Sequence, residues 1–150
     1  MRKLLTCLAF TALAVPAMGQ EALKITPAHS VVWKPHPLFP GSQAALLTGN
    51  PSEAEAIVLR NKIPPNFRLA PHQHSFLEVG TVLSGSLWQA EGDKFDASKG
   101  QKLTAGSVWV LPPGRPHYMW TTDEGAEFQI NFTGPAKVEF RNPADDPRKK

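Results

Sequence analysis

The stretch Arg68–Gly85 reads RLAPHQHSFLEVGTVLSG, and the fold of this 150-residue chain can be predicted from its pattern. His72 and His74 are two residues apart, so on a β-strand both imidazole rings lie on the same face. Glu78 follows His74 at a distance that lets the chain turn into the next strand. Gly85 comes seven residues after Glu78, where we expect the tight turn of a hairpin.

A second stretch, Gly106–His117, reads GSVWVLPPGRPH. Its apolar run Ser107–Leu111 is typical of a strand, which the turn residues Pro112–Gly114 then end. His117 opens the next predicted strand, residues 117–122. Three of the chain's five histidines therefore fall within these two stretches.

The two stretches resemble the two signature motifs of the cupin superfamily. The first motif, His-x-His-(three or four)-Glu-(six)-Gly, is met by His72, His74, Glu78 and Gly85. The second motif, Gly-(five)-Pro-x-Gly-(two)-His-(three)-Asn, is met by Gly106, Pro112, Gly114 and His117. Two positions depart from the family pattern: Asn66 replaces the usual opening glycine of the first motif, and Thr121 replaces the closing asparagine of the second.

The resemblance covers about residues 57–140 and contains one pair of motifs, so it implies a small single-domain bacterial cupin. It implies an all-β fold, a cupin-type jelly-roll barrel, with one metal ion held inside. The implied metal ligands are His72, His74, Glu78 and His117. Glu78 is also the expected catalytic residue, because no second general base is evident and Glu78 and metal-bound water would transfer protons.

Three neutral imidazoles and one carboxylate form a mixed set of nitrogen and oxygen donors. Such a set suits one divalent transition metal, namely Zn, Cu, Fe, Mn or Ni, and is poor for Ca or Mg. Affinity for these ligands rises towards Cu and Zn, so a site loaded outside the cytosol is expected to hold one of these two metals. Cupins, by contrast, often use Fe or Mn. The alternative is a barrel that has lost its metal, in which His72 and His74 are ordinary residues.

Short strand-like runs recur from Glu55 onward, with residues typical of turns between them. The chain has 15 prolines and 11 glycines, which argue against long helices. We therefore expect an all-β barrel or sandwich over residues 50–142. The predicted strands cover residues 56–60, 68–74, 78–83, 87–90, 107–111, 117–122, 126–132 and 137–140.

Strand periodicity also predicts which side chains surround the site. Met119 shares a face with His117 and is expected inside the barrel, either in the cavity wall or as plain core. Arg68 has the parity of His72, so it would bind a ligand carboxylate at the cavity mouth unless it is an ordinary surface arginine. Gln129 alternates with apolar neighbours, so its amide either binds a ligand or faces solvent.

The N-terminal residues 1–19 resemble a cleavable signal peptide. Basic residues precede the apolar run Leu4–Val15, which is too short to cross a bilayer as a helix. Small residues up to Gly19 are typical of a cleavage site, so we expect a periplasmic or secreted protein. The single cysteine, Cys7, would leave with this leader, and the mature chain would then form no disulfide.

Residues 20–49 are rich in proline and are expected to form an extended N-terminal arm that packs on the barrel. Trp33 and His36 in this arm could cover a barrel mouth, and the arm could also pair two copies as a homodimer. Residues 143–150 are expected to form a polar tail that frays.

The remaining partner predictions rest on charge and hydropathy. The formal net charge is +3, and two of the basic residues lie in the predicted leader, which argues against nucleic acid as a partner. The chain has no second long apolar run after the leader, so no membrane partner is expected once the leader is removed. A small molecule is the predicted ligand.

Three functions remain open at this point. In the first, the protein is a metal-dependent oxygenase, lyase or isomerase that acts on a small molecule bound to the metal. In the second, it is a non-enzymatic module that uses the same barrel to bind or sense a metal or a small ligand. In the third, the barrel is a structural remnant without metal. The fold alone does not choose among them.

Overall fold

The computed structural model describes residues 22–150, and the predicted signal peptide, residues 1–19, lies outside the described residues. Ten strands dominate residues 22–150, which confirms the all-β prediction. The strands are β1 (Lys34–Pro35), β2 (Gln43–Thr48), β3 (Ala56–Ile63), β4 (Arg68–His74), β5 (Glu78–Glu91), β6 (Gln101–Thr104), β7 (Val108–Leu111), β8 (His117–Trp120), β9 (Ala126–Thr133) and β10 (Val138–Phe140). Single-turn 3-10 helices are η1 (Ala28–Ser30), η2 (Ala97–Lys99), η3 (Pro143–Asp145) and η4 (Pro147–Lys149). Within residues 22–150, no helix has the length and apolar character needed to cross a membrane.

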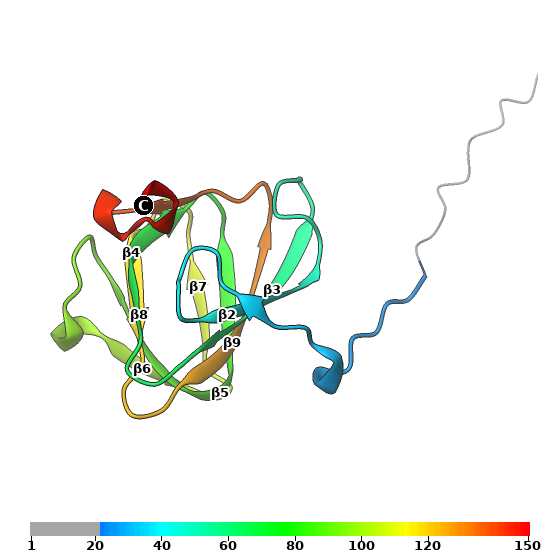
Figure 1. Cartoon of the computed structure of the whole chain (residues 1–150), viewed down its shortest axis with the longest axis horizontal. Helices are drawn as coiled ribbons and strands as arrows, with labels where there is room; N and C mark the ends of the chain where they lie inside the picture. Colours follow the sequence, from blue (N-terminus) through cyan, green and yellow to red (C-terminus); the bar gives the residue numbers. More distant parts are fainter. Residues whose placement is uncertain (1–21) are drawn as a thin grey trace, which may run out of the picture.

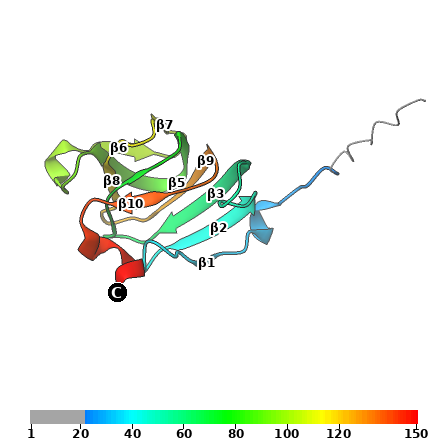
Figure 2. The same cartoon turned by 90° about the horizontal axis from the view of Figure 1, so that it is seen from above.

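The strands form one curled, barrel-like sheet. Its hydrogen-bonded order is β1-β2-β3-β9-β5-β8-β4-β10, and β6 and β7 each pair with β5 beside this path. All of these pairs are antiparallel. Seen from above, β1, β2 and β3 form a layer that faces the layer of β6, β7 and β8 (Figure 2). The interior between these layers is the place where the predicted site should lie.

The longest strand, β5, corrects the prediction of a hairpin turn at Ser84–Ser86. β5 runs through this segment without interruption, pairing first with β7 and β9 and then with β6 and β8 (Figure 1). The register to β9 shifts between Val82 and Ser84, so Gly85 serves a bulge rather than a turn. Gly85 has a φ of +69°, and a Cβ there would lie 2.0 Å from the carbonyl oxygen of Gly125.

The turn between β3 and β4 accommodates both departures from the cupin motifs. Asn66 has a φ of +55°, a left-handed conformation that asparagine tolerates better than most residues. The hydroxyl of Thr121 donates a hydrogen bond of 2.6 Å to the carbonyl of Pro64. It also accepts one of 3.0 Å from the backbone N–H of Phe67. Thr121 therefore fastens this turn to the residues that follow β8.

The inward-facing side chains of the strands form the main core. On β9 burial alternates along the strand, and Phe128, Ile130 and Phe132 face inward. They pack in one cluster with Ile57 and Ile63 of the neighbouring strand β3. Burying a side chain of this size stabilises the fold by about 1.5–3 kcal/mol, so this cluster holds β3, β9 and the rest of the sheet in place around the interior.

A second aromatic cluster lies on the outer side of β8. All four residues of β8 are buried, and Tyr118 and Trp120 are the two that belong to this second cluster. Both rings pack on Phe95, each at a centroid distance of 5.2 Å. The hydroxyl of Tyr118 donates a hydrogen bond of 3.0 Å to the carbonyl of Asp96. We call this group the outer cluster; its members are Trp88, Ala90, Phe95, Tyr118 and Trp120.

The described part of the N-terminal arm, residues 22–49, both extends from the barrel and joins it. Residues 22–32 run away from the barrel (Figures 1 and 2), and Leu23 and Ile25 are exposed there. Further along, β1 pairs with β2, and β2 pairs with β3. The second half of the arm is therefore part of the sheet. We call the loop between these two strands, residues 36–42, the cap loop.

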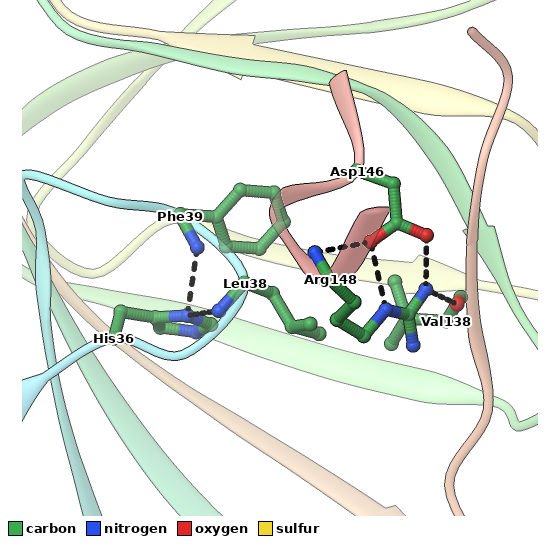
Figure 3. Close-up of polar contacts among 6 residues, drawn as sticks. All are labelled: His36, Leu38, Phe39, Val138, Asp146 and Arg148. Carbon is green, nitrogen blue, oxygen red and sulfur yellow. Dashed lines mark hydrogen bonds and ion pairs between the residues drawn. The ribbon is translucent and has the colours of Figure 1, made fainter. Parts of the chain in front are cut away.

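The C-terminal residues 143–150 differ from the frayed tail that their polar composition predicts. They form η3 and η4, whose first turns are capped by the side chains of Asn142 and Asp146. Nη2 of Arg148 donates a hydrogen bond of 2.9 Å to the carbonyl of Val138 in β10. Nε of Arg148 also forms an ion pair of 2.8 Å with Asp146 (Figure 3). These contacts attach the tail to β10.

Candidate metal centre

Three histidines meet inside the barrel. His72 and His74 come from β4, His117 comes from β8, and the antiparallel register places His72 opposite His117. Each ring offers one nitrogen such that all three nitrogens lie within 4.8 Å of one another. The three residues are at most 5% exposed. The pairing of β4 with β8 therefore brings together the two sequence stretches that resemble the cupin motifs.

Glu78, at the start of β5, lies beside His74, but the group of ligand atoms within 4.8 Å of one another consists of the three histidines without it. Its Oε2 lies 3.3 Å from Nε2 of His74, and its Oε1 accepts a hydrogen bond of 2.7 Å from the indole N–H of Trp109. One carboxylate oxygen is thus held by the protein while the other faces a histidine. Trp109 reaches this position because β7 pairs with β5 opposite Gly80, where a Cβ would lie 2.0 Å from the indole ring.

Burial keeps the three imidazoles neutral. Loss of solvation lowers the pKa of His72 and of His74 to about 4, and the pKa of His117 falls well below its usual range. Nδ1 of His72 lies 2.8 Å from the carbonyl of Ala70. That nitrogen therefore carries the ring proton and donates a hydrogen bond to the carbonyl. Nε2 is then unprotonated and able to bind a metal.

The surroundings of His74 and Glu78 provide the test of whether a metal fits. The His74 ring stacks on Phe76 at a centroid distance of 4.5 Å, and neither of its nitrogens has a hydrogen-bond partner of good geometry. A buried polar atom without a partner costs about 1–3 kcal/mol. Burial also raises the pKa of Glu78 to about 7, and the hydrogen bond from Trp109 only partly opposes this shift. A divalent transition metal would satisfy both groups, and three imidazoles with one carboxylate are a suitable donor set for it.

The histidine cluster lies in the wall of a cavity of about 500 Å³, which is a usual size for a small-molecule site. Phe39 of the cap loop packs on the His72 ring at a centroid distance of 5.0 Å. Phe39 also contacts Phe140 of β10, at 5.7 Å. Apolar side chains make up most of the wall, among them Leu38, Phe39, Leu46, Leu59, Leu69, Phe76, Met119, Phe128, Ile130, Phe132 and Val138. The cavity therefore offers an apolar volume next to the candidate ligands.

Of the three residues predicted to surround the metal, Met119, Arg68 and Gln129, the structure places only Met119 in the cavity wall. Met119 lines the cavity, but Arg68 lies outside it, exposed, with its guanidinium 4.4 Å from the ring centroid of Phe95. The pairing of β4 with β8 shifts in register between Leu69 and His72. This irregularity reverses the face of Arg68 relative to His72, so the parity argument fails there.

Gln129 also lies outside the cavity. Its Oε1 accepts a hydrogen bond of 3.1 Å from Nε of Arg60, and both residues lie on the outer face of the sheet. The alternation of Gln129 with Phe128 and Ile130 follows the predicted strand pattern. The pattern separates two faces, and in this strand the apolar face is the one that lines the cavity.

Two residues of the site are not identified by the sequence analysis, Trp109 and Phe39. Trp109 lies in an apolar run that is typical of plain core, and its bond to Glu78 depends on how β7 pairs with β5. The one available hint is Gly80, whose lack of a side chain makes room for a large ring on the facing strand. Phe39 lies in a proline-rich segment with no periodicity that would place it over His72.

Comparisons with known proteins agree with this architecture. Residues 56–136 match the family model described as the AraC-like ligand binding domain. The H2HPP isomerase of Bacillus subtilis is 38% identical over 61 residues, which are 40% of this chain and 24% of that protein. The chain thus matches about a quarter of the length of this curated relative.

Solved structures with the same fold include two bacterial proteins of low sequence identity. The polyketide cyclase RemF from Streptomyces resistomycificus has a TM-score of 0.71 and 20% identity, covering 84% of this chain and 90% of that one. A cupin 2 conserved barrel domain protein from Rhodopseudomonas palustris has a TM-score of 0.63 and 13% identity, covering 83% of this chain and 89% of that one. These likenesses confirm the cupin-type barrel.

Proposed function

Since this chain belongs to the family of AraC-like ligand-binding domains, with a cupin-type barrel, we propose that it is a metal-dependent protein that acts on a small apolar molecule. The metal would be held by the ligand set His72, His74, Glu78 and His117. The observation that carries this proposal is that the histidine cluster lines an apolar cavity of about 500 Å³. Such a cavity accepts a ligand whose apolar body fills the volume and whose oxygen-bearing end faces the cluster.

The bound metal would act as a Lewis acid that polarises a carbonyl or carboxyl oxygen of the ligand. The residues of the chain contribute position and proton handling. Ala70 holds the His72 ring through Nδ1, and Trp109 holds Glu78 through Oε1. Among residues 22–150, Glu78 is the only acidic residue in the wall of this cavity, so it is the group that would receive or return a proton. The apolar wall excludes water from that proton transfer.

Among enzyme classes, we favour an isomerase, cyclase or lyase over an oxygenase. These reactions require a group that removes and returns a proton, which a single carboxylate in an apolar cavity can provide. The names of two similar proteins, an isomerase and a polyketide cyclase, support this class. The second candidate, a non-enzymatic ligand-binding or sensing module, is supported by the description of the matching family as a ligand-binding domain.

The metal part of the proposal is tested by elemental analysis of the purified full chain. We expect about one transition-metal ion per chain in the wild type and a large loss in His72→Ala and His117→Ala. Gln129→Ala is the matched control, because Gln129 faces away from the cavity, and it should keep the wild-type metal content. Equal metal content in all four proteins would overturn the proposed site.

The enzymatic part is tested with phenylpyruvate, which joins an apolar ring to a chelating keto acid and carries exchangeable protons beside its carbonyl. In D₂O, followed by proton NMR, the metal-loaded protein should speed deuterium exchange at that carbon, and Glu78→Gln should not. Binding of phenylpyruvate without faster exchange would favour the non-enzymatic module instead. Absence of binding would contradict the proposed ligand class.

A further inference from the structure

A second polar spot interrupts the apolar wall of the cavity. It consists of His36 from the cap loop and Asn61 from β3, and neither belongs to the histidine cluster. Asn61 is 5% exposed, and it pairs with the apolar residue Phe128 on β9. A buried amide in an apolar wall is destabilising unless its oxygen and NH₂ group form hydrogen bonds. The polar groups next to Asn61 therefore indicate which of these two is available to a ligand.

The ring of His36 is fixed by its own loop (Figure 3). Its Nδ1 accepts hydrogen bonds from the backbone N–H groups of Leu38, at 3.0 Å, and Phe39, at 3.2 Å. The backbone N–H of His36 donates to the carbonyl of Ser42 at 3.0 Å, which closes the cap loop. Because Nδ1 acts as an acceptor, the proton of the neutral ring must be on Nε2. Burial favours this neutral ring, lowering the pKa of His36 to about 4.

The His36 ring in turn orients the amide of Asn61. Both side chains line the same cavity, and Asn61 acts on the His36 ring as an acceptor that raises its pKa against the effect of burial. Nδ1 is already used by the cap loop, so only Nε2–H of His36 is left to face Asn61. Nε2–H is a donor, so it must face the amide oxygen of Asn61, and the NH₂ group of Asn61 is then left to point elsewhere. Asn61 lines the cavity, so its NH₂ group is a donor in the cavity wall.

We propose that Asn61, held by His36, donates a hydrogen bond to an oxygen atom of the bound molecule, at a point separate from the metal. Asn61 would be a ligand-contacting residue and His36 a positioning residue. This inference rests on the proposed function and narrows its ligand class. The ligand would have an apolar body with oxygen atoms at two places, one facing the histidine cluster and the other facing Asn61.

Phe39 supports the idea that one molecule spans both places. Its ring contacts the His36 ring at a centroid distance of 4.8 Å and the His72 ring at 5.0 Å. A single phenyl ring therefore reaches from one polar spot to the other. A flat aromatic or alicyclic body lying against Phe39 would present its two oxygen-bearing ends to the two spots.

The test compares two pairs of probes on the zinc-loaded full chain by isothermal titration calorimetry. The pairs are benzoate with 4-hydroxybenzoate, and 2-naphthoate with 6-hydroxy-2-naphthoate; in each pair only the second member has an oxygen at the far end of the ring. A neutral hydrogen bond contributes about 1 kcal/mol, so at least one hydroxylated probe should bind about fivefold more tightly than its parent. Asn61→Leu, which keeps the side-chain size, should abolish this preference, and His36→Phe should weaken it. His29→Phe, a substitution of an exposed histidine, is the matched control.

The outcomes separate this inference from the proposed function. If the parents bind but neither hydroxylated probe is preferred, or if Asn61→Leu keeps the preference, the role of Asn61 is overturned while the metal and cavity proposal stands. If no probe binds zinc-loaded wild type, both are contradicted. The ratio of the two dissociation constants within a pair is the readout, because a purely structural defect would weaken both members equally.

Discussion

The inner and outer sides of β8 are both buried, yet their polar atoms are arranged differently. On the outer side, the Tyr118 hydroxyl is bonded to the Asp96 carbonyl, and Gly100 packs so closely that a Cβ there would lie 2.0 Å from the Trp120 ring. On the inner side, His117 lies beside His74 of the paired strand β4. Neither nitrogen of the His74 ring has a hydrogen bond of good geometry to any described residue, and a cavity of about 500 Å³ adjoins the ring. The outer cluster is thus filled and satisfied by the chain itself, whereas the inner side combines a cavity with three histidines that could bind a metal.

Acidification of the metal-free protein should have the largest effect, because it acts on the whole inner side at once. The pKa values of His36, His72 and His74 are lowered from 6.5 to about 4 in the folded protein. Between pH 6.5 and about pH 4 the unfolded chain therefore binds more protons than the folded protein. The contribution of the neutral histidines to the free energy of unfolding is present above pH 6.5 and is lost as the pH falls towards 4. Glu78, with its pKa raised to about 7, acts in the opposite direction but is a single group.

We therefore expect the urea midpoint of chelator-treated protein to fall as the pH drops from 7 to 4.5. His74→Phe, which removes one of the titrating rings, should show a shallower decline. A midpoint that does not change over this range would show that the inner side is not as desolvated as the structure indicates.

Truncation of the outer cluster should give the next largest effect, and it should affect stability alone. Trp120→Ala removes a buried ring that packs on Phe95 and Tyr118, so the free energy of unfolding should fall by about 3–5 kcal/mol. Metal content per folded chain should stay at the wild-type value. Denaturant unfolding and elemental analysis of the same sample check both statements. Loss of metal without loss of stability would remove the distinction between the two sides of β8.

Removal of the hydrogen bond to Glu78 should weaken the metal site by a smaller amount. Trp109→Phe keeps an aromatic ring but loses the indole N–H that holds Oε1. Loss of a partner that orients a ligand typically lowers metal affinity by about 10–100-fold, which a competition titration with a chelating dye can measure. Trp88→Phe in the outer cluster is the matched control and should leave the affinity unchanged. Equal affinities in both variants would argue that Glu78 is not part of the site.

The smallest change in the free energy of unfolding is expected from His74→Phe in the absence of metal. The direction of this change is more informative than its size. The phenyl ring can keep the stacking on Phe76 while removing two buried nitrogens that have no hydrogen bond of good geometry to any described residue. The metal-free variant should therefore be more stable than metal-free wild type, by about 1 kcal/mol at neutral pH. Unfolding of both chelator-treated proteins in urea measures this difference. A less stable variant would mean that the His74 nitrogens are bonded in solution.

Strand alternation and turn residues are sufficient to predict the fold class, and the meeting of His72, His74 and His117 follows from the resemblance of their motifs to those of cupins. It fails for Arg68 because one irregularity in β4 changes which face a residue occupies. It fails at Ser84–Ser86 because a glycine with positive φ serves a bulge as well as it serves a turn. Both errors concern the register between strands, which no single strand encodes.

The parts contributed by the proline-rich segment are still harder to predict. The positions of Phe39 and His36 depend on the conformation of the cap loop. That conformation is held by the hydrogen bonds to Nδ1 of His36 and by the pairing of β1 with β2. No periodic pattern describes such a loop. The hydrogen bond from Trp109 to Glu78 is equally hard to predict. It joins side chains of β7 and β5, two paired strands that are far apart in the sequence.

The order of the sheet has one mechanical consequence. β1 and β10 are its two ends, and no ladder of backbone hydrogen bonds joins them. Near β10, Phe39 of the cap loop packs on Phe140 through its aromatic ring. β5 lies in the middle of the order and is hydrogen-bonded to strands on both of its sides, so its backbone is held along both edges. Movement of the Phe39 ring away from Phe140 would therefore break none of the strand pairs of the sheet.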